Sequence, residues 1–439
     1  MSGSVSIRTQ PGRLPPPRAD SVAFFANLSH IFFDNEGLTE SLRAEVEGLE
    51  TYGGRLLPIV GLLWSGADNL LVMEREPHAG LPGYFRERLG LRLPEVLVCG
   101  AELPPDPTLV RALKDKPGRL VDGFVTDRKL AGIAAEAGLG LAGTVEGSLR
   151  GNNKLLLHEF LAAAGEPVFE TLFAETPDDV GKAAAELARR GYRQAVAKAQ
   201  IGASGIGLVR FETAEAPVLP PPVFRDGKCL VQGWLDEAVP EIERVASPSV
   251  QMLIAAAGIE LYDLTDQILS PRSIHEGNVS PPPSLANKRL RDEVLRQAGV
   301  AARWLHAQGY RGTASADFHL AFWRGGHVEV RVCELNARVT GATYPSLLAR
   351  HFAPGGAWLM RNLRLPEAPR GKEIFEELDD RGLLYQTGMD SGVLPINFNS
   401  KVPGRITKGQ FLFIGPDAGT VAGLLEQTVA LDEITFTRD

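Results

Sequence analysis

Short apolar runs alternate with helical stretches over the first third of the chain. The runs include SVAFFANL, NLLVMER and EVLVCG, and the helical stretch LAGIAAEAGL closes the region before residue 145. This alternation is typical of a βαβ-type layer with a largely buried sheet. No GxGxxG follows the first run, so nothing there is expected to grip a dinucleotide. Residues 20–150 are predicted to form an α/β domain that supplies a pocket wall or a substrate-side unit.

The middle of the chain mixes helices and strands. One helix is predicted from near Asn153 to Gly165, a second through TPDDVGKAAAELARRG, and strands at QAVAKA, LVRFE and CLVQGWL. A long helix follows the Pro-rich segment 281–285, with an apolar stripe of Leu290, Val294, Ala298, Ala301 and Leu305. Residues from about 375 form a mixed tail, so the fold class is α/β (α+β).

The segment 312–341 predicts a β-hairpin that carries charged residues. Runs rich in Val, Phe and Trp flank Gly325-Gly326, a favoured two-residue turn. Counting outward from this turn puts Asp317 directly opposite Glu334. Cβ atoms of such a pair lie about 5 Å apart, so the two carboxylates repel each other. The pairing therefore requires a positive charge nearby.

Asn336 and Arg338 extend the polar face of this hairpin. They follow Glu334 at i+2 and i+4, so they project from the same side of the strand. Two carboxylates and an amide oxygen are hard ligands that suit Mg²⁺, which shares its shell with phosphate oxygens and water. Asp317, Glu334 and Asn336 are therefore candidate metal ligands. An exposed hairpin with a slipped register is the alternative.

A glycine-rich loop between two strands is a second candidate site. In AVAKAQIGASGIGLVRF (195–211), Lys198 precedes a loop that contains Gly202, Gly205 and Gly207. Backbone N–H groups of such a loop can close over phosphates, and the lysine adds a compact charge. Because the loop joins strand to strand, a Walker P-loop and a Rossmann turn are excluded. An ordinary hairpin turn with a surface lysine explains the same residues.

Two further segments offer groups to a nucleotide. The strand KCLVQGWLDE ends on residues that can frame adenine or accept from ribose hydroxyls: Gln232, Trp234, Leu235, Asp236 and Glu237. A buried strand running into a turn is the alternative. Lys154 opens its helix and can reach a phosphate from the electropositive end, although a lysine at a helix start is common.

Composition narrows the class of protein. The 439 residues are 44% hydrophobic and 23% charged, as in a soluble protein of about three domains. The net charge of −8 makes a nucleic-acid partner unexpected. Cys99, Cys229 and Cys333 lie far apart, which fits a reducing cytoplasm. No apolar run reaches the roughly 20 residues of a membrane span, and residues 1–19 look like a flexible leader.

The order of these parts resembles the ATP-grasp fold. A lysine at a helix start, a strand–lysine–glycine loop–strand unit, a hinge strand, a helix and a D…ExNxR hairpin succeed one another over residues 150–350. The resemblance implies ATP and Mg²⁺, expected as two ions. It implies phosphate contacts from Lys154, Lys198, Gly202, Ser204, Gly205 and Gly207. The adenine and ribose site would consist of Gln232, Trp234, Leu235 and Glu237. The resemblance also implies metal ligation by Asp317, Glu334 and Asn336, and catalytic roles for Lys198 and Arg338.

A narrower resemblance concerns the segments CELNARVTGATYPSLL and GYRGTASADFH. They are similar to the pheganomycin-type peptide ligases, which carry a pre-ATP-grasp domain in front and a small C-terminal α/β domain behind. That layout implies domains over 20–150, 151–365 and 366–439. Gln232 departs from the Glu of many ATP-grasp proteins, but an amide can also accept from the adenine amino group.

The resemblance implies an ATP-dependent carboxylate–amine ligase that forms an amide or peptide bond through an acyl phosphate. Its partners would be a small acid or amino acid and an amine or peptide in natural-product biosynthesis. An ATP-grasp enzyme with another acceptor, such as a carboxylase or phosphotransferase, and a non-catalytic nucleotide-binding module stay open. The chain has no Met-Lys-Met biotin segment, which counts mildly against carboxylation.

Three points about substrates stay open in the sequence. His319 is a candidate acceptor for the amine proton, with packing on Val332 as the alternative. His275 and Glu276 are expected on a loop that either lines the substrate pocket or is plain surface. The sequence identifies neither substrate nor the oligomeric state, although a homodimer is the commonest assembly.

Overall fold

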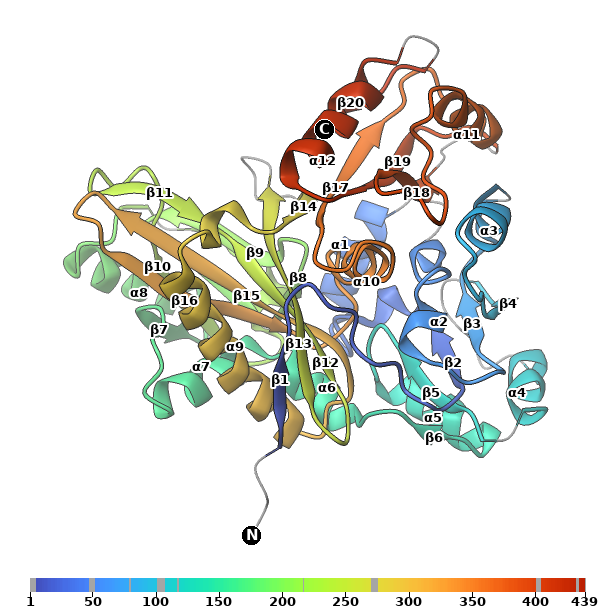
Figure 1. The fold of residues 1–439 in the computed structure, drawn as a ribbon. Coiled ribbons are helices and arrows are strands. Elements are labelled where there is room, and N and C mark those ends of the chain that lie inside the picture. Colours follow the sequence, from blue (N-terminus) through green and yellow to red (C-terminus); the bar gives the residue numbers. More distant parts are fainter. Residues whose placement is uncertain are drawn as a thin grey trace.

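Three β-sheets organise the chain in a computed structural model (Figure 1). The structure describes residues 5–46, 52–78, 80–100, 107–116, 118–215, 217–269, 275–399, 404–431 and 434–438. Within these ranges a five-stranded N-terminal sheet, a four-stranded sheet and an eleven-stranded sheet follow one another along the sequence, except that the first strand of the chain joins the eleven-stranded sheet. No described helix has both the length and the apolar character needed to cross a bilayer.

The N-terminal sheet is parallel and follows the order β4–β3–β2–β5–β6. Its strands are β2 (Val22–Phe25), β3 (Leu70–Met73), β4 (Glu95–Val98), β5 (Leu120–Gly123) and β6 (Gly140–Leu141). Parallel neighbours need long crossovers, and these contain α1 (Glu36–Val46), α2 (Val60–Leu63), α3 (Gly80–Gly83), α4 (Pro107–Lys114) and α5 (Arg128–Ala137). The βαβ-type layer expected from the apolar runs is confirmed.

The four-stranded sheet is antiparallel and carries the glycine-rich loop. Its order is β7–β10–β8–β9, with β7 (Thr171–Ala174), β8 (Gln194–Ala203), β9 (Ile206–Glu212) and β10 (Cys229–Trp234). Two helices accompany it, α7 (Lys154–Ala163) and α8 (Pro177–Arg189). The apolar residues Val180, Ala183, Ala184 and Leu187 of α8 are buried, as its amphipathic sequence requires.

The eleven-stranded sheet carries the predicted charged hairpin. Its main path is β11–β15–β12–β13–β14–β17–β19–β18. Outside this path, β16 pairs with β15, β1 with β13 and β20 with β17. The strands in its first part are β11 (Ile242–Ala246), β12 (Pro248–Ile254), β13 (Ile259–Leu269), β14 (His275–Ser280), β15 (Gly312–Trp323) and β16 (Val328–Asn336). Helix α9 (Lys288–Ala307) packs on it through Val294, Ala298, Ala301 and Leu305, which confirms the predicted stripe.

The C-terminal part continues this sheet and adds helices to it. It contains β17 (Ala357–Arg364), β18 (Gly392–Asn399), β19 (Lys408–Gly415) and β20 (Thr437–Arg438), with α10 (Thr343–Phe352), α11 (Gly371–Asp380) and α12 (Ala418–Val429). Strand β14 pairs with β17, so the sheet runs on without a break. One apolar cluster joins residues of the N-terminal and C-terminal parts, including Phe24, Trp64, Trp358 and Phe411. The predicted domain limits of 20–150, 151–365 and 366–439 stay predictions.

Two expectations about local structure are wrong. Residues 7–18 are not a free leader, because β1 (Ile7–Thr9) pairs in parallel with β13 and Arg18 bridges to Trp64. Residues 1–4 lie outside the described residues. His275 and Glu276 lie on strand β14 and not on a loop. Both segments are rich in polar residues and prolines or glycines, so they lack the alternation by which a half-buried strand is recognised.

Candidate active site

The hairpin of β15 and β16 places Asp317 opposite Glu334, as the sequence predicts. The turn itself differs from the prediction, because Trp323 N–H donates to His327 O at 2.9 Å and Gly326 has φ +82°. This is a three-residue loop with a left-handed glycine. A bulge between Asp317 and Phe318 in the pairing then shifts the register back. The three-residue loop and the bulge shift the pairing by one residue in opposite directions, so Asp317 and Glu334 still face each other.

Between turn and bulge the pairing is offset by one residue. His319 therefore lies opposite Arg331 and not Val332. Its Nε2–H donates to the Leu235 carbonyl at 2.9 Å, and its ring lies 4.9 Å from that of Trp234. Burial lowers the pKa of His319 to about 4. The ring is thus a neutral packing group, and the expected contact with Val332 across the hairpin is wrong.

Neutral donors surround one carboxylate of the pair. Ser249 Oγ donates to Asp317 Oδ1 at 2.6 Å, and Asn336 Nδ2 donates to Asp317 Oδ2 at 2.9 Å. Burial, and then the charge of Glu334, raise the pKa of Asp317 to about 6. The carboxylate is therefore costly to keep ionised while no cation reaches it.

Cationic side chains flank the other carboxylate. Lys154 Nζ lies 2.9 Å from Glu334 Oε2, where the two side chains are 10% and 25% exposed. Burial alone would raise the pKa of Glu334, but the charges of Lys154 and Arg338 outweigh it, and the pKa falls below its usual value. The chain's own cations thus relieve the repulsion in part. Repulsion alone does not require a metal here, and the argument for one comes from the ligand chemistry.

Helix α7 delivers Lys154 to this centre. Asn153 caps the helix by accepting from Leu156 N–H at 3.0 Å, which fixes the first turn. Lys154 Nζ also donates to Gly202 O at 3.0 Å. A Cβ on Gly202 would lie 2.8 Å from the Ile206 carbonyl, so the close approach of these strands requires glycine. The glycine-rich loop therefore touches the carboxylate centre through Lys154.

The loop is a tight turn between β8 and β9. Ser204 and Gly205 form its tip with φ +53° and +81°, and Gly207 also has positive φ. The ten-residue strand β8 brings Gly202 into the sheet, so the flap is shorter than the sequence suggested. Phosphate contacts by Gly202, Ser204, Gly205 and Gly207 stay a prediction.

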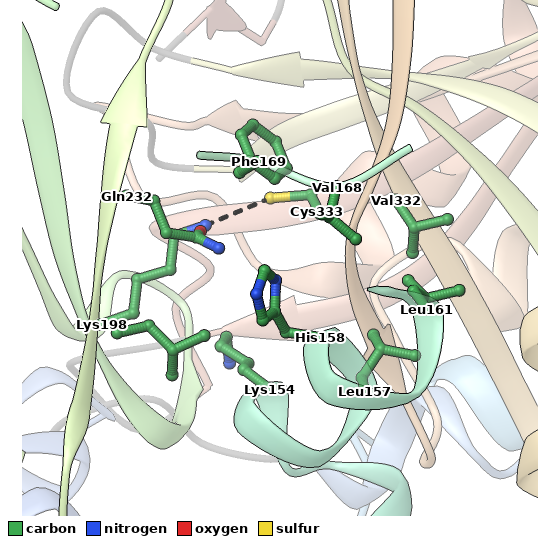
Figure 2. A pocket seen from close by; sticks show the side chains of 11 residues that line it. Lys154, Leu157, His158, Leu161, Val168, Phe169, Lys198, Gln232, Val332 and Cys333 are labelled. Carbon is green, nitrogen blue, oxygen red and sulfur yellow. Dashed lines mark hydrogen bonds between the residues drawn. The ribbon is translucent and has the colours of Figure 1, made fainter. Parts of the chain in front are cut away.

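A pocket of about 310 Å³ lies beside the carboxylate centre (Figure 2). Lys198 and Gln232 reach it from β8 and β10, while Lys154 and His158 reach it from α7. Lys198 is only 3% exposed, and its Nζ lies 3.5 Å from Cys333 Sγ. No carboxylate of the described residues forms an ion pair with it. A buried lysine without a direct ion pair favours an anionic ligand.

Of the predicted adenine-binding residues, Gln232 lines the pocket and Trp234 lies near Lys198, as does Phe169, which the sequence did not indicate. The Phe169 and Trp234 rings lie 5.4 and 5.6 Å from its Nζ. Gln232 Nε2 donates to Thr171 Oγ1 at 3.0 Å, whereas the buried Gln232 Oε1 has no hydrogen-bond partner among the described residues. A free amide acceptor suits the adenine amino group. The departure from Glu thus leaves an acceptor in place.

Two predicted nucleotide contacts point elsewhere. The Leu235 carbonyl already accepts from His319. Glu237 Oε1 accepts from Val245 N–H at 3.0 Å and is exposed, and neither residue lines the pocket. Asp236 is buried and forms an ion pair with Arg210. Ribose contact by Glu237 stays a prediction that requires a different side-chain position.

Two asparagines that are not among the predicted site residues connect helix α7 with the hairpin and with strand β8. Asn152 Oδ1 accepts from Arg338 Nη1 at 2.5 Å and from Ala337 N–H at 3.2 Å. Asn153 Nδ2 donates to Gln200 Oε1 at 2.8 Å, which ties α7 to β8. The Asn152-Asn153 pair before a helix is a capping signal, but its contacts 185 residues away cannot be read from local pattern.

The donor set fits a divalent cation that phosphate helps to hold. Asp317, Glu334 and Asn336 offer hard oxygen atoms from adjacent strands. No group of three or more His, Cys, Asp or Glu side chains within the described ranges could hold a metal alone. Mg²⁺ commonly takes one or two carboxylates and completes its shell with water and substrate phosphates. The residues therefore fit Mg²⁺ but not a closed structural metal site.

Comparisons with known proteins agree on the fold. No protein-family model and no curated protein matches the sequence. A biotin carboxylase–β,γ-ATP complex from Campylobacter jejuni is 14% identical with a TM-score of 0.58, covering 95% of this chain and 92% of that one. An N5-carboxyaminoimidazole ribonucleotide synthetase in complex with ADP is 13% identical with a TM-score of 0.57, covering 95% and 97%.

A third structure is similar over nearly its whole length. It is the biotin carboxylase domain dimer of Hydrogenobacter thermophilus 2-oxoglutarate carboxylase, in complex with MgADP, ADP and bicarbonate, at 11% identity, TM-score 0.55 and coverage of 95% and 91%. At such identities the likeness establishes the fold alone. The chain has the ATP-grasp fold, preceded by a parallel α/β layer and followed by a C-terminal α/β part.

Proposed function

We propose that this protein is an ATP-dependent ligase that activates a carboxylate as an acyl phosphate and joins it to an amine. The observation that carries the proposal is the facing pair of Asp317 and Glu334, with Lys154 on Glu334 and Asn336 on Asp317. An ATP-grasp fold with this centre intact has the groups that phosphoryl transfer needs, namely positioning and compensation of negative charge.

The two lysines and the pocket account for nucleotide binding. Lys198 carries a buried charge over the pocket, and Lys154 stands between the glycine-rich loop and Glu334. We assign phosphate contact to both lysines and adenine contact to Gln232 and the Phe169–Trp234 walls. Mg²⁺ at Asp317, Glu334 and Asn336 would neutralise charge on the transferring phosphoryl group.

Arg338 is assigned to the second half of the reaction. The acid's carboxylate oxygen attacks the γ-phosphorus and ADP leaves; the amine nitrogen then attacks the acyl carbon, its C–O bond to phosphate breaks, and the amine proton passes to solvent or phosphate. Asn152 holds the Arg338 guanidinium at 2.5 Å beside the carboxylates. A fixed guanidinium there can stabilise the acyl phosphate and the tetrahedral oxyanion.

The second candidate is a carboxylase. It is favoured by the similar structures, which are a carboxyaminoimidazole ribonucleotide synthetase and biotin carboxylases, one of them with bicarbonate bound. Both reactions activate a carboxylate-type oxygen by phosphorylation and differ in the group that is activated. The resemblance of residues 309–319 and 333–348 to pheganomycin-type peptide ligases leads us to prefer an organic acid and an amine or peptide.

An ADP-release screen separates the candidates. Purified protein with ATP and Mg²⁺ is supplied with pairs of carboxylic acids and amino acids or peptides, and in parallel with bicarbonate and each amine alone. We expect ADP release that needs both an organic acid and an amine, with one amide formed per ADP by mass spectrometry. Release that needs bicarbonate and yields a carboxylated amine would replace the ligase by the carboxylase.

Two variants make the screen specific to the proposed centre. Glu334→Ala should lower acid-dependent ADP release by about 100- to 1,000-fold, while Glu243→Ala on the exposed face of β11 should leave it unchanged. Equal activity of Glu334→Ala and the native protein would refute the metal assignment. Binding of ATP without turnover for any acid, amine or bicarbonate would favour a non-catalytic nucleotide-binding module.

A further inference from the structure

A second pocket lies between the N-terminal sheet and the eleven-stranded sheet. It measures about 290 Å³ with its opening to solvent included. Its apolar walls are Phe24, Leu63, Trp64, Leu253 and Tyr310, and its polar groups are Arg18, Asp122 and Thr313. Its lining therefore combines apolar walls with one acidic and one basic side chain.

Its place in the N-terminal sheet is the one where parallel sheets bind ligands. The strand order β4–β3–β2–β5–β6 reverses direction between β2 and β5. Phe24 and Asp122 are paired neighbours on these two strands, one residue before each strand ends. Ligands of open parallel sheets bind at such a switch point beyond the carboxyl ends of the strands.

A continuous polar row connects the pocket to the carboxylate centre. Thr313, Ser315 and Asp317 alternate along β15 and so share one face. Leu253 lies opposite Thr313, and Asn336 lies opposite Ser315. Thr313 and Asp317 are four residues apart, which is about 13 Å along a strand. The pocket therefore opens on the same sheet face as the proposed reaction centre.

Tyr310 joins the two regions electrostatically. Its hydroxyl donates to the Thr313 carbonyl, and it interacts with the charges of both Asp122 and Arg338. The pocket shares no lining residue with the pocket beside Lys198.

The two charged groups of the pocket are held apart. Asp122 is 7% exposed, and the hydrogen bond that the described residues give its carboxylate comes from Gly123 N–H at 2.9 Å. Arg18 stacks on Trp64 at 4.6 Å and donates to Ile254 O at 2.9 Å. No ion pair joins Arg18 and Asp122 among the described contacts. A buried anion and a cation that face one pocket without meeting leave room for a ligand carrying both charges.

We infer that this pocket binds an α-amino acid with an apolar side chain as a zwitterion. Asp122 receives the ammonium, Arg18 receives the carboxylate, and the side chain lies among Phe24, Leu63 and Leu253. This assignment rests on the proposed ligase for its biological meaning, since it names the class of one substrate. The binding itself needs neither ATP nor turnover.

Isothermal titration without nucleotide tests the assignment on the native chain. The probes are L-leucine, L-leucinamide, which lacks the carboxylate, and 4-methylpentanoate, which lacks the ammonium, with L-valine, L-phenylalanine and L-aspartate for side-chain preference. We expect saturable binding of at least one apolar amino acid, and binding weaker by about 10- to 100-fold for each analogue that loses one charged contact. Tighter binding of aspartate than of all three apolar amino acids would contradict the apolar side-chain site.

Variants assign the contacts to residues. Arg18→Gln should lose the preference for leucine over leucinamide but keep the preference over 4-methylpentanoate, and Asp122→Asn should do the reverse. Arg18→Lys should bind at an intermediate strength. The exposed Arg128→Gln and Asp68→Asn are the matched controls.

The binding test and the test of ligase activity give independent results. Absence of binding by every amino acid at millimolar concentration, or equal binding of leucine and both analogues, would overturn the zwitterion site whether or not the protein releases ADP. Binding with the expected preferences in a protein that never turns over ATP would retain the site and overturn the ligase.

Discussion

Asp263 on β13 and Asp317 on β15 are carboxylates of the same sheet with different surroundings. Asp263 is 1% exposed and fully paired: Arg350 contacts both oxygens at 2.8 and 2.9 Å, and Ser346 Oγ and Trp358 Nε1 donate at 2.5 and 3.0 Å. Asp317 has neutral donors and faces a second carboxylate.

The difference distinguishes a structural charge from a functional one. The Asp263 network joins β13, α10 and β17, so it holds the central and C-terminal parts of the sheet together. A charge that is completely paired has nothing left to offer a ligand. Burial, and then the incompletely compensated charge of Glu334, raise the pKa of Asp317 to about 6. Such perturbed groups mark sites that bind a charged partner.

The largest expected effect is on stability at Asp263. Asp263→Asn leaves Arg350 buried without a counter-ion, so the free energy of unfolding should fall by about 3–5 kcal/mol. Urea denaturation measures it, with the exposed Asp68→Asn as control. A loss below about 1 kcal/mol would show that the network is not structural.

The reverse pattern is expected at Glu334. Glu334→Ala should lower the rate of ADP release by about 100- to 1,000-fold, about 3–4 kcal/mol of transition-state stabilisation. Its free energy of unfolding should stay within about 1 kcal/mol of native, since the lost contact with Lys154 is offset by relief of repulsion on Asp317. A variant that unfolds while the native rate persists in its folded fraction would reverse the comparison.

Asp122 extends the comparison to a buried carboxylate whose contribution to the free energy of unfolding depends on pH. Burial raises its pKa from 3.8 to about 6, so folding favours the protonated acid and the ionised form costs about 3 kcal/mol. This cost is present above pH 6 and is lost as the pH falls through 6 towards 4. Asp122→Asn should therefore be more stable than native at pH 8, with the advantage vanishing near pH 4 in denaturant titrations. An advantage that does not change with pH would contradict an ionised, unpaired Asp122.

The smallest effect is expected at Lys198. Removing its charge in Lys198→Ala should raise the KM for ATP by about 10- to 100-fold, as loss of one charged contact of about 1.5–3 kcal/mol. The exposed Lys182→Ala is the control. Steady-state kinetics with an unchanged ATP dependence would remove Lys198 from the nucleotide site.

The sequence predicted the carboxylate pair for reasons that were only partly correct. The glycine pair suggested a two-residue turn, whereas a three-residue loop and a bulge together restore the pairing of Asp317 and Glu334. Alternation of apolar residues specifies which side faces the core, so it fixes the face more strongly than the turn type. His319 lies between the turn and the bulge, where the pairing is offset by one residue, so it faces Arg331 and not the predicted Val332.

Other features depend on contacts that no local pattern contains. Asn152 meets Arg338 from 186 positions away, and Arg18 reaches Ile254 from 236 positions away. The N-terminal segment pairs as a strand although its composition suggested a leader. The lysine, the glycine-rich loop and the hairpin could be recognised because each is a local motif in a fixed order. The second pocket could not, because five separate stretches of the chain build it, within 18–24, 63–64, 122–123, 253 and 310–313.

Divalent-cation binding to the carboxylate pair is the most direct test of the account. Mn²⁺ is titrated in the presence of ADP and followed by electron paramagnetic resonance, in the native protein, Glu334→Gln and Glu243→Gln. The expected result is saturable, ADP-dependent binding in the native protein and Glu243→Gln that is lost in Glu334→Gln. Equal Mn²⁺ binding by all three proteins, or none by the native protein with ADP bound, would contradict a metal-dependent centre at Asp317 and Glu334.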